Sequence, residues 1–148
     1  MKKVQIFLLV LIAFSLSQCK TTQFEKQAPF TIQSATYNYW KGGQPNVGGT
    51  KVSFAYKATK PVEFDSIYFQ QKSVKVELQE IAGTTYVVGF FNNSRNIPVV
   101  GQVKATEKKQ STPFQLGPNE AVLSYLKDGK IKYFKVSDLE EVSSNMNQ

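Results

Sequence analysis

The chain has 148 residues, with 18 Lys and Arg against 11 Asp and Glu, no His and a single Cys. A chain of this length suits one domain with its own hydrophobic core. The absence of His excludes imidazole bases and imidazole metal ligands, and one Cys excludes an internal disulfide and a thiolate zinc site. We therefore expect no metal, no cofactor and no enzymatic activity.

The first 18 residues have the features of an export signal. Lys2 and Lys3 precede "VQIFLLVLIAFSLS", residues 4–17, which is apolar apart from Gln5 and two serines. This run is shorter than the roughly 18–20 apolar residues that a membrane-spanning helix needs. A positive start, a short apolar region and small residues before a boundary predict an export signal rather than a permanent span.

The sequence "LSQC", residues 16–19, places the only cysteine at this boundary. It resembles the lipobox of bacterial lipoprotein signal peptides, with Gln18 where Gly, Ala or Ser is usual. The resemblance implies that Cys19 receives a diacylglycerol thioether, that the signal is cut before it and that its new amino group is acylated. Two or more acyl chains anchor a protein stably in a membrane. The alternative is an ordinary secretory signal followed by an incidental free thiol.

We expect four segments along the chain. They are a signal peptide at 1–18, a polar tether at 19–28, a β domain at 29–137 and a polar C-terminal tail at 138–148. Lys20 occupies the position where Asp often retains a lipoprotein in the inner membrane, so the resemblance implies delivery to the outer membrane. Ser137 and Glu140 have the spacing of a capping box, which allows at most one helical turn in the tail.

Most of the remaining chain consists of short runs of β-branched and aromatic residues separated by Gly, Pro and Asn. Residues 51–58 alternate most cleanly, with Val52, Phe54 and Tyr56 on one face. This pattern is typical of a strand that buries one face and exposes the other.

Residues 74–78 show the same alternation over a shorter run. It predicts that Val74, Val76 and Leu78 point into the core, while the charged residues between them face solvent. The other expected strands are residues 30–40, 66–69, 85–91 and 98–106.

Residues 121–136 form the clearest predicted hairpin, because Asp128-Gly129 is a favoured two-residue type I′ turn. This turn places Lys127 opposite Lys130 and so fixes the register of the two strands. The face expected in the core carries Ala121, Leu123, Tyr125, Phe134 and Val136, with Lys132 at its margin.

The runs together predict about seven or eight strands at short spacing, and helical periodicity is scarce. We therefore expect an all-β fold, either an antiparallel β-sandwich or a small barrel, preceded by the signal peptide and a short tether.

Three stretches, "YNYWKGGQPNVGGT", "FDSIYFQ" and "NEAVLSYLKDGKIKYFKV", carry a resemblance to a family of proteins. They are similar to small, functionally uncharacterised lipoproteins of flavobacteria and related Bacteroidota, in which an aromatic strand ends in a Trp before a glycine-rich loop. The matching residues are Tyr37, Tyr39, Trp40, Gly42, Gly43, Gly48, Gly49, Asp65, Tyr68 and Phe69. The resemblance implies a location in the cell envelope and adds no established activity.

Three aromatic residues, Tyr37, Tyr39 and Trp40, border the glycine-rich loop at residues 41–49. Strand alternation places the two tyrosines on one face and Trp40 on the other. One hypothesis is an aromatic platform that stacks on a sugar or a peptide. The alternative is a core Trp with surface tyrosines, beside a loop whose glycines serve the turn.

Two further motifs fall on one short segment. Asp65-Ser66-Ile67 resembles the acceptor motif for protein O-glycosylation in Bacteroidota, with Ser66 as the acceptor, but it also fits an ordinary start of a strand. Glu63 and Asp65 are two apart, so on a strand they share a face, as the paired carboxylates of a glycosidase must. Exposed acidic residues are far more often structural than catalytic, so an enzyme based on this pair is the weakest hypothesis.

The lysines predict a solvated basic face, because acidic residues interrupt them and no recognition helix or RNA-binding aromatic motif accompanies them. We expect no nucleic-acid partner. The preferred functional prediction is a lipid-anchored, non-enzymatic accessory or binding module of the cell envelope. Its expected partners are membrane lipid, through acylated Cys19, and an envelope protein or glycan. The alternative is a carbohydrate-binding surface lipoprotein that uses Trp40 and the nearby tyrosines.

Overall fold

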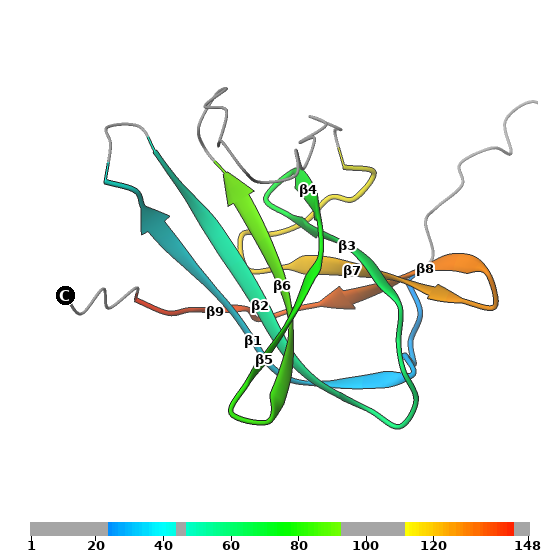
Figure 1. Ribbon diagram of the computed structural model, residues 1–148. Helices are drawn as coiled ribbons and strands as arrows, with labels where there is room; N and C mark the ends of the chain where they lie inside the picture. Colours follow the sequence, from blue (N-terminus) through cyan, green and yellow to red (C-terminus); the bar gives the residue numbers. More distant parts are fainter. Residues whose placement is uncertain (1–23, 44–46, 93–111, 144–148) are drawn as a thin grey trace, which may run out of the picture.

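A computed structural model of the protein describes residues 24–43, 47–92 and 112–143. These residues are all-β (Figure 1) and include no helix long and apolar enough to cross a membrane. Their nine strands are β1 (Phe30–Lys41), β2 (Gly48–Ala58), β3 (Phe64–Phe69), β4 (Lys72–Lys75), β5 (Glu77–Ile81), β6 (Thr84–Asn92), β7 (Ala121–Lys127), β8 (Lys130–Val136) and β9 (Glu140–Glu141).

The strands form two sheets that pack face to face as a β-sandwich (Figure 1), so the predicted fold class is confirmed. Sheet A has five strands in the order β5-β6-β2-β1-β9, and sheet B has four in the order β4-β3-β7-β8. Neighbouring strands are antiparallel except for β1 and β9, which run parallel.

The core lies between the sheets and uses alternate residues of each strand. Val52 and Phe54 of β2 are fully buried there, as the alternation of this segment predicted. A side chain at Gly89 of β6 would lie 2.9 Å from Val74 and 3.0 Å from Ile67, so glycine allows the sheets to approach closely at this point. The buried core cluster is Phe30, Tyr37, Val52, Phe54, Phe64, Ile67, Phe69, Val87, Phe91, Ala121, Leu123, Tyr125, Val136 and Leu139.

The β7–β8 hairpin has the predicted register, with Lys127 opposite Lys130 at the turn. Asp128 and Gly129 have φ angles of 52° and 71°, the left-handed values that a type I′ turn requires at both positions. The face expected in the core is buried or packed against the core, and Lys132 lies at its margin. The prediction for this hairpin is confirmed.

The predicted strand at residues 74–78 is in fact two strands. β4 ends at Lys75 and pairs with β3, whereas β5 begins at Glu77 and pairs with β6, so the chain crosses from sheet B to sheet A at Val76. Val74 and Val76 pack against the core as expected. Leu78 lies opposite the core residue Val87 and so has the predicted facing, but it is 56% exposed because β5 is an edge strand that packs mainly on β6. The predicted strand at residues 98–106 lies outside the described residues.

The end of the predicted tether belongs to the folded domain. The ring of Phe24 lies 5.5 Å from that of Phe114, and the backbone N–H of Glu25 donates to the carbonyl of Tyr133. The Glu25 carboxylate also pairs with Lys132 at 2.7 Å. These contacts hold the chain along the free edge of β8, so the predicted boundary at residue 28 was too late.

The start of the predicted polar tail is also part of the sandwich. Leu139 is 2% exposed and sits in the core, while Glu140 pairs with Thr36 as strand β9. The backbone N–H of Val142 donates to the carbonyl of Tyr37 at 2.9 Å. The capping-box spacing of Ser137 and Glu140 forms no helical turn, because burial of Leu139 and the open edge of β1 draw this segment into an extended strand.

Candidate functional site

Three side chains from three strands lie on the outer face of sheet A, away from the core. Trp40 of β1 lies opposite Gly49 of β2, and Lys51 of β2 lies opposite Phe90 of β6. Residues directly opposite in an antiparallel pair share a face. Gly49 and Lys51 are two residues apart on β2 and so share a face, whereas the core residue Val52, next to Lys51 in sequence, points the other way. We call Trp40, Lys51 and Phe90 the tryptophan face.

The position of the Trp40 ring depends on the glycine opposite it. A β-carbon at Gly49 would collide with the carbonyl oxygen of Phe91 and lie 2.9 Å from Trp40 Nε1. The indole therefore lies across the backbone of β2 where only glycine leaves room. Trp40 is half-buried, and its Nε1 is buried without a hydrogen-bond partner among the described residues. A ligand on this side would meet the exposed part of the ring rather than the indole N–H.

Lys51 and Phe90 extend this surface across the sheet. The Lys51 ammonium lies 5.7 Å from the centre of the Phe90 ring, within range of a cation–π contact. Phe90 is 36% exposed, so part of its ring remains open to solvent. Asn38 and Ser53, both half-buried, share this face and add short polar groups next to Lys51. The surface thus combines aromatic rings, hydrogen-bonding groups and a positive charge.

The two predicted tyrosines lie on the opposite side of β1, as strand alternation indicated. Tyr37 is a core residue, 5% exposed, and its hydroxyl donates to Glu141 at 3.1 Å. Burial and this hydrogen bond raise the pKa of Tyr37. Tyr39 is 45% exposed, and its hydroxyl accepts a hydrogen bond from Gln70. The structure therefore does not bring Tyr37, Tyr39 and Trp40 together as one platform, and Tyr37 offers no open ring.

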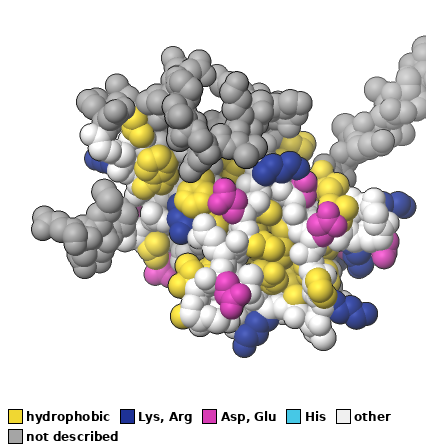
Figure 2. Space-filling view, viewed as in Figure 1, with side chains coloured by type: hydrophobic (Ala, Val, Ile, Leu, Met, Phe, Trp, Pro, Cys, Tyr) yellow, Lys and Arg dark blue, Asp and Glu magenta, His cyan; other side chains and the backbone are white. Residues whose placement is uncertain are grey.

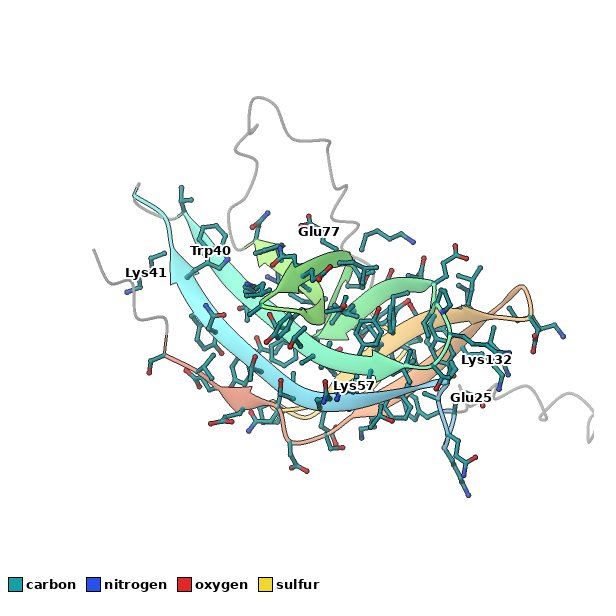
Figure 3. The ribbon with its side chains drawn as sticks, turned by 60° about the horizontal axis from the view of Figure 1, so that its bottom comes forward. Glu25, Trp40, Lys41, Lys57, Glu77 and Lys132 are labelled. Carbon is teal, nitrogen blue, oxygen red and sulfur yellow. The ribbon has the colours of Figure 1, made fainter. Side chains whose placement is uncertain are left out.

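The tryptophan face lies at one end of the long strands. Figure 3 shows Trp40 and Lys41 at this end and the Glu25–Lys132 pair at the other. Because the chain enters the domain at Phe24, beside that ion pair, the tryptophan face is remote from the point where the N-terminal segment joins the sandwich.

Asp65 is the centre of a polar cluster on sheet B. Its carboxylate accepts hydrogen bonds from Ser66 Oγ at 2.9 Å and Ser124 Oγ at 3.1 Å, and it also pairs with Lys75. Burial by itself raises the pKa of Asp65, but the hydrogen bonds from Lys75, Ser66 and Ser124 outweigh it and lower that pKa below its usual range. An ionised carboxylate satisfied in this way is suited to holding strands together rather than to donating a proton.

Ser66, the predicted glycosylation acceptor, is 8% exposed and its hydroxyl is committed to Asp65. It lies on β3 between β4 and β7, opposite Lys75 and Ser124. The folded domain therefore does not present this hydroxyl to a modifying enzyme. Glu63 is exposed and precedes the β-bulge of β3 at Phe64, and the Asp65 cluster does not include it.

The lysines do not gather into a continuous basic stripe on the face seen in Figure 2, where acidic and basic side chains are interspersed. Acidic side chains neutralise some of the lysines directly, since Lys75 pairs with Asp65, Lys132 with Glu25 and Lys135 with Glu120. Within the part of the chain that the structure describes, no three Cys, Asp or Glu side chains come together as a metal site would require.

Sequence reasoning identified Trp40 but missed Lys51 and Phe90. The outward position of Lys51 follows from the alternation of residues 51–58, and that signal was available. The position of Phe90 beside Lys51 could not be predicted, because the pairing of β2 with β6 joins segments some 40 residues apart. Cys19, the predicted lipidation site, lies outside the described residues.

A comparison of the chain with protein-family models, with curated proteins and with solved structures found no match.

Proposed function

We propose that this protein is a lipid-anchored, non-enzymatic binding module of the cell envelope, and that its tryptophan face holds a carbohydrate. The observation that carries the ligand class is the outer face of sheet A, where the Trp40 indole lies against Gly49 on the same face as the Lys51–Phe90 pair. The anchor is proposed from the sequence, in which the only cysteine stands at the end of an export signal.

Carbohydrate fits this surface for chemical reasons. A sugar ring presents C–H groups on one face, which pack on an aromatic ring, and hydroxyl groups at its edge, which need hydrogen-bonding partners. Phe90 offers the ring, and Asn38 and Ser53 offer such partners on the same face. The positive charge of Lys51 favours a glycan that carries carboxylate or other anionic groups.

Isothermal titration calorimetry of the mature chain with envelope polysaccharide fragments tests whether the ligand is a carbohydrate. We expect Phe90→Ala to weaken binding about tenfold, the loss of roughly 1.4 kcal/mol of stacking. Leu78→Ala is the matched control, because Leu78 is also an exposed apolar residue of sheet A, on an edge strand, and should bind like the wild type. Equal affinities of both variants and the wild type would remove the tryptophan face as the site.

Metabolic labelling with a fatty acid tests the anchor. The wild-type protein should incorporate the label and fractionate with membranes, whereas Cys19→Ala should lose the label and the membrane association. Recovery of the wild type in the soluble fraction, with an unmodified residue 19 by mass spectrometry, would contradict the proposal.

A second candidate ligand is an extended segment of an envelope protein. An open groove of about 680 Å³ between β1 and β8 is lined by Phe30, Ile32 and Phe134. Among the described residues, β9 pairs with β1 only at Thr36 and Tyr37, so the first half of β1 keeps a free edge along this groove.

A photo-crosslinking residue placed at Gln33, which lines this groove, tests the second candidate. We expect one contiguous peptide of an envelope protein to crosslink at position 33 and not at position 78, which serves as the control. The absence of a specific crosslink at position 33 in cells that make the protein would remove this candidate.

A further inference from the structure

The domain begins very close in sequence to its proposed lipid anchor. Phe24 is fixed by its ring contact with Phe114, and Glu25 by its backbone hydrogen bond to Tyr133. Phe24 comes five residues after Cys19. Five residues span at most about 18 Å even when fully extended. If Cys19 carries lipid, the end of the sandwich at Phe24 must lie within that distance of the membrane surface.

This end of the molecule exposes apolar side chains. Leu126 and Ile131 face each other across the β7–β8 hairpin, next to its turn. Ile131 is 41% exposed and Leu126 is half-buried. Tyr133 is two residues from Ile131 on the same strand and so shares its face, and Phe24 lies beside it, because Glu25 bonds to the Tyr133 carbonyl.

Four lysines lie at this end of the molecule. Lys127 and Lys130 flank the turn, and Lys26 follows the ion-paired Glu25. The structure gives none of these three lysines an ion pair with a described residue. Lys60 belongs to the β2–β3 connection, which reaches the same end because Ala58 lies opposite Phe30 at the start of β1.

Two carboxylates offset part of the positive charge of these four lysines. Asp128 is in the turn itself, and Glu63 is nearby because its backbone carbonyl accepts a hydrogen bond from Leu126. Glu25 and Lys132 neutralise each other at 2.7 Å. The surface is therefore positive on balance, and apolar at its centre, which is the composition of protein surfaces that rest on anionic lipid headgroups.

We infer that the hairpin end, defined by Phe24, Leu126, Lys127, Lys130 and Ile131, rests on an anionic phospholipid surface and sets the orientation of the domain. The inference depends on the proposed lipid anchor, which brings this end to the membrane. Ile131 packs among the headgroups while the flanking lysines contact lipid phosphates. As Figure 3 shows, Trp40 lies at the opposite end from Glu25 and Lys132, so this orientation directs the tryptophan face away from the bilayer.

Hydrogen–deuterium exchange on a chemically anchored protein tests this orientation. The chain from residue 19 onward is coupled through its only thiol, Cys19, to a maleimide lipid in vesicles that contain phosphatidylglycerol. We expect amides at Lys130 and Ile131 to exchange at least about threefold more slowly than in the uncoupled protein. Amides of Gly42 and Gly43, at the Trp40 end, should keep their rates.

A matched pair of charge reversals provides the control. Lys130→Glu should abolish the slowing at the hairpin, whereas Lys41→Glu, at the exposed end of β1, should preserve it. Slowing should also disappear on vesicles of phosphatidylcholine alone. Equal slowing at both ends of the molecule, slowing at the Trp40 end only, unchanged rates at the hairpin or equal slowing without anionic lipid would each overturn the inference.

The design separates this inference from the proposed function. Because the anchor is attached chemically, a failure here counts against the hairpin end alone. The lipid anchor is tested separately by fatty-acid labelling in cells, and the carbohydrate ligand by calorimetry in solution. A failure of either test would count against the proposed function and not against the hairpin end.

Discussion

The outer faces of the two sheets differ in what covers them. On sheet B, the ring of Phe114 packs on Tyr68 at 4.9 Å and on Tyr133 at 5.1 Å, and Ser124 of β7 is fully buried. On sheet A, Phe90 is 36% exposed and Lys51 is half-buried. Polar residues on the covered face satisfy one another and serve the fold. Polar residues on the open face remain able to form hydrogen bonds with a ligand.

The largest expected effect comes from removing the cover of sheet B. Phe114 is 4% exposed, and Phe114→Ala should lower the free energy of unfolding by about 3 kcal/mol, since it leaves a cavity between Tyr68 and Tyr133. Phe90→Ala on the open face should cost about 1 kcal/mol. Urea denaturation followed by circular dichroism measures both. Similar losses for the two variants would show that the faces do not differ as described.

A smaller effect is expected at the glycine beneath Trp40. Gly49→Ala should cost about 2 kcal/mol and displace the indole, because the new methyl group meets Phe91 and Trp40. The single tryptophan of the chain reports the displacement through its fluorescence maximum. Gly43→Ala is the control, because a β-carbon there meets none of the described residues within 4 Å. An unchanged emission maximum in Gly49→Ala would contradict the assigned position of the ring.

The smallest effect concerns acid stability on the covered face. The pKa of Asp65 is lowered in the folded state, since hydrogen bonds from Lys75, Ser66 and Ser124 outweigh the opposing effect of burial. The ionised group therefore contributes stability that is fully present above the ordinary pKa near 4 and is lost as the pH falls through the folded value.

Asp65→Asn should remove this contribution, so the variant is less stable than the wild type at pH 7 and loses less stability below about pH 4. Unfolding curves in urea between pH 7 and pH 2.5 measure the difference. Parallel pH dependences for variant and wild type would contradict the role given to the cluster.

What the sequence could predict depended on the range of the interactions. The β7–β8 register followed from Asp128-Gly129 and the alternation of its neighbours, all within one hairpin. The burial of Ser124 did not follow, because its hydrogen-bonding partners Asp65 and Ser66 lie on β3, almost 60 residues earlier in the sequence.

The same limit explains the errors. Leu78 lies on the inner side of its sheet as its alternation indicates, yet it is exposed because the chain changes sheets at Val76, and no local signal marks a crossing between two extended segments. Leu139 stands in a polar sequence, but it completes the core because Glu140 pairs with Thr36, more than 100 residues earlier. Within the candidate site, the sequence indicated Trp40 and the side of the strand on which it lies. Its neighbours on that face could be identified only once the order of the strands in the sheet was known.

The most direct test of the open face uses the one indole of the chain. In ¹H–¹⁵N NMR spectra of the mature protein, titration with acidic polysaccharide fragments from the envelope should shift the indole signal of Trp40 and the amides of Lys51 and Phe90. The amides of Tyr68 and Tyr133 should keep their positions. Shifts confined to sheet B, or the absence of shifts at Trp40 with every fragment tested, would contradict the account.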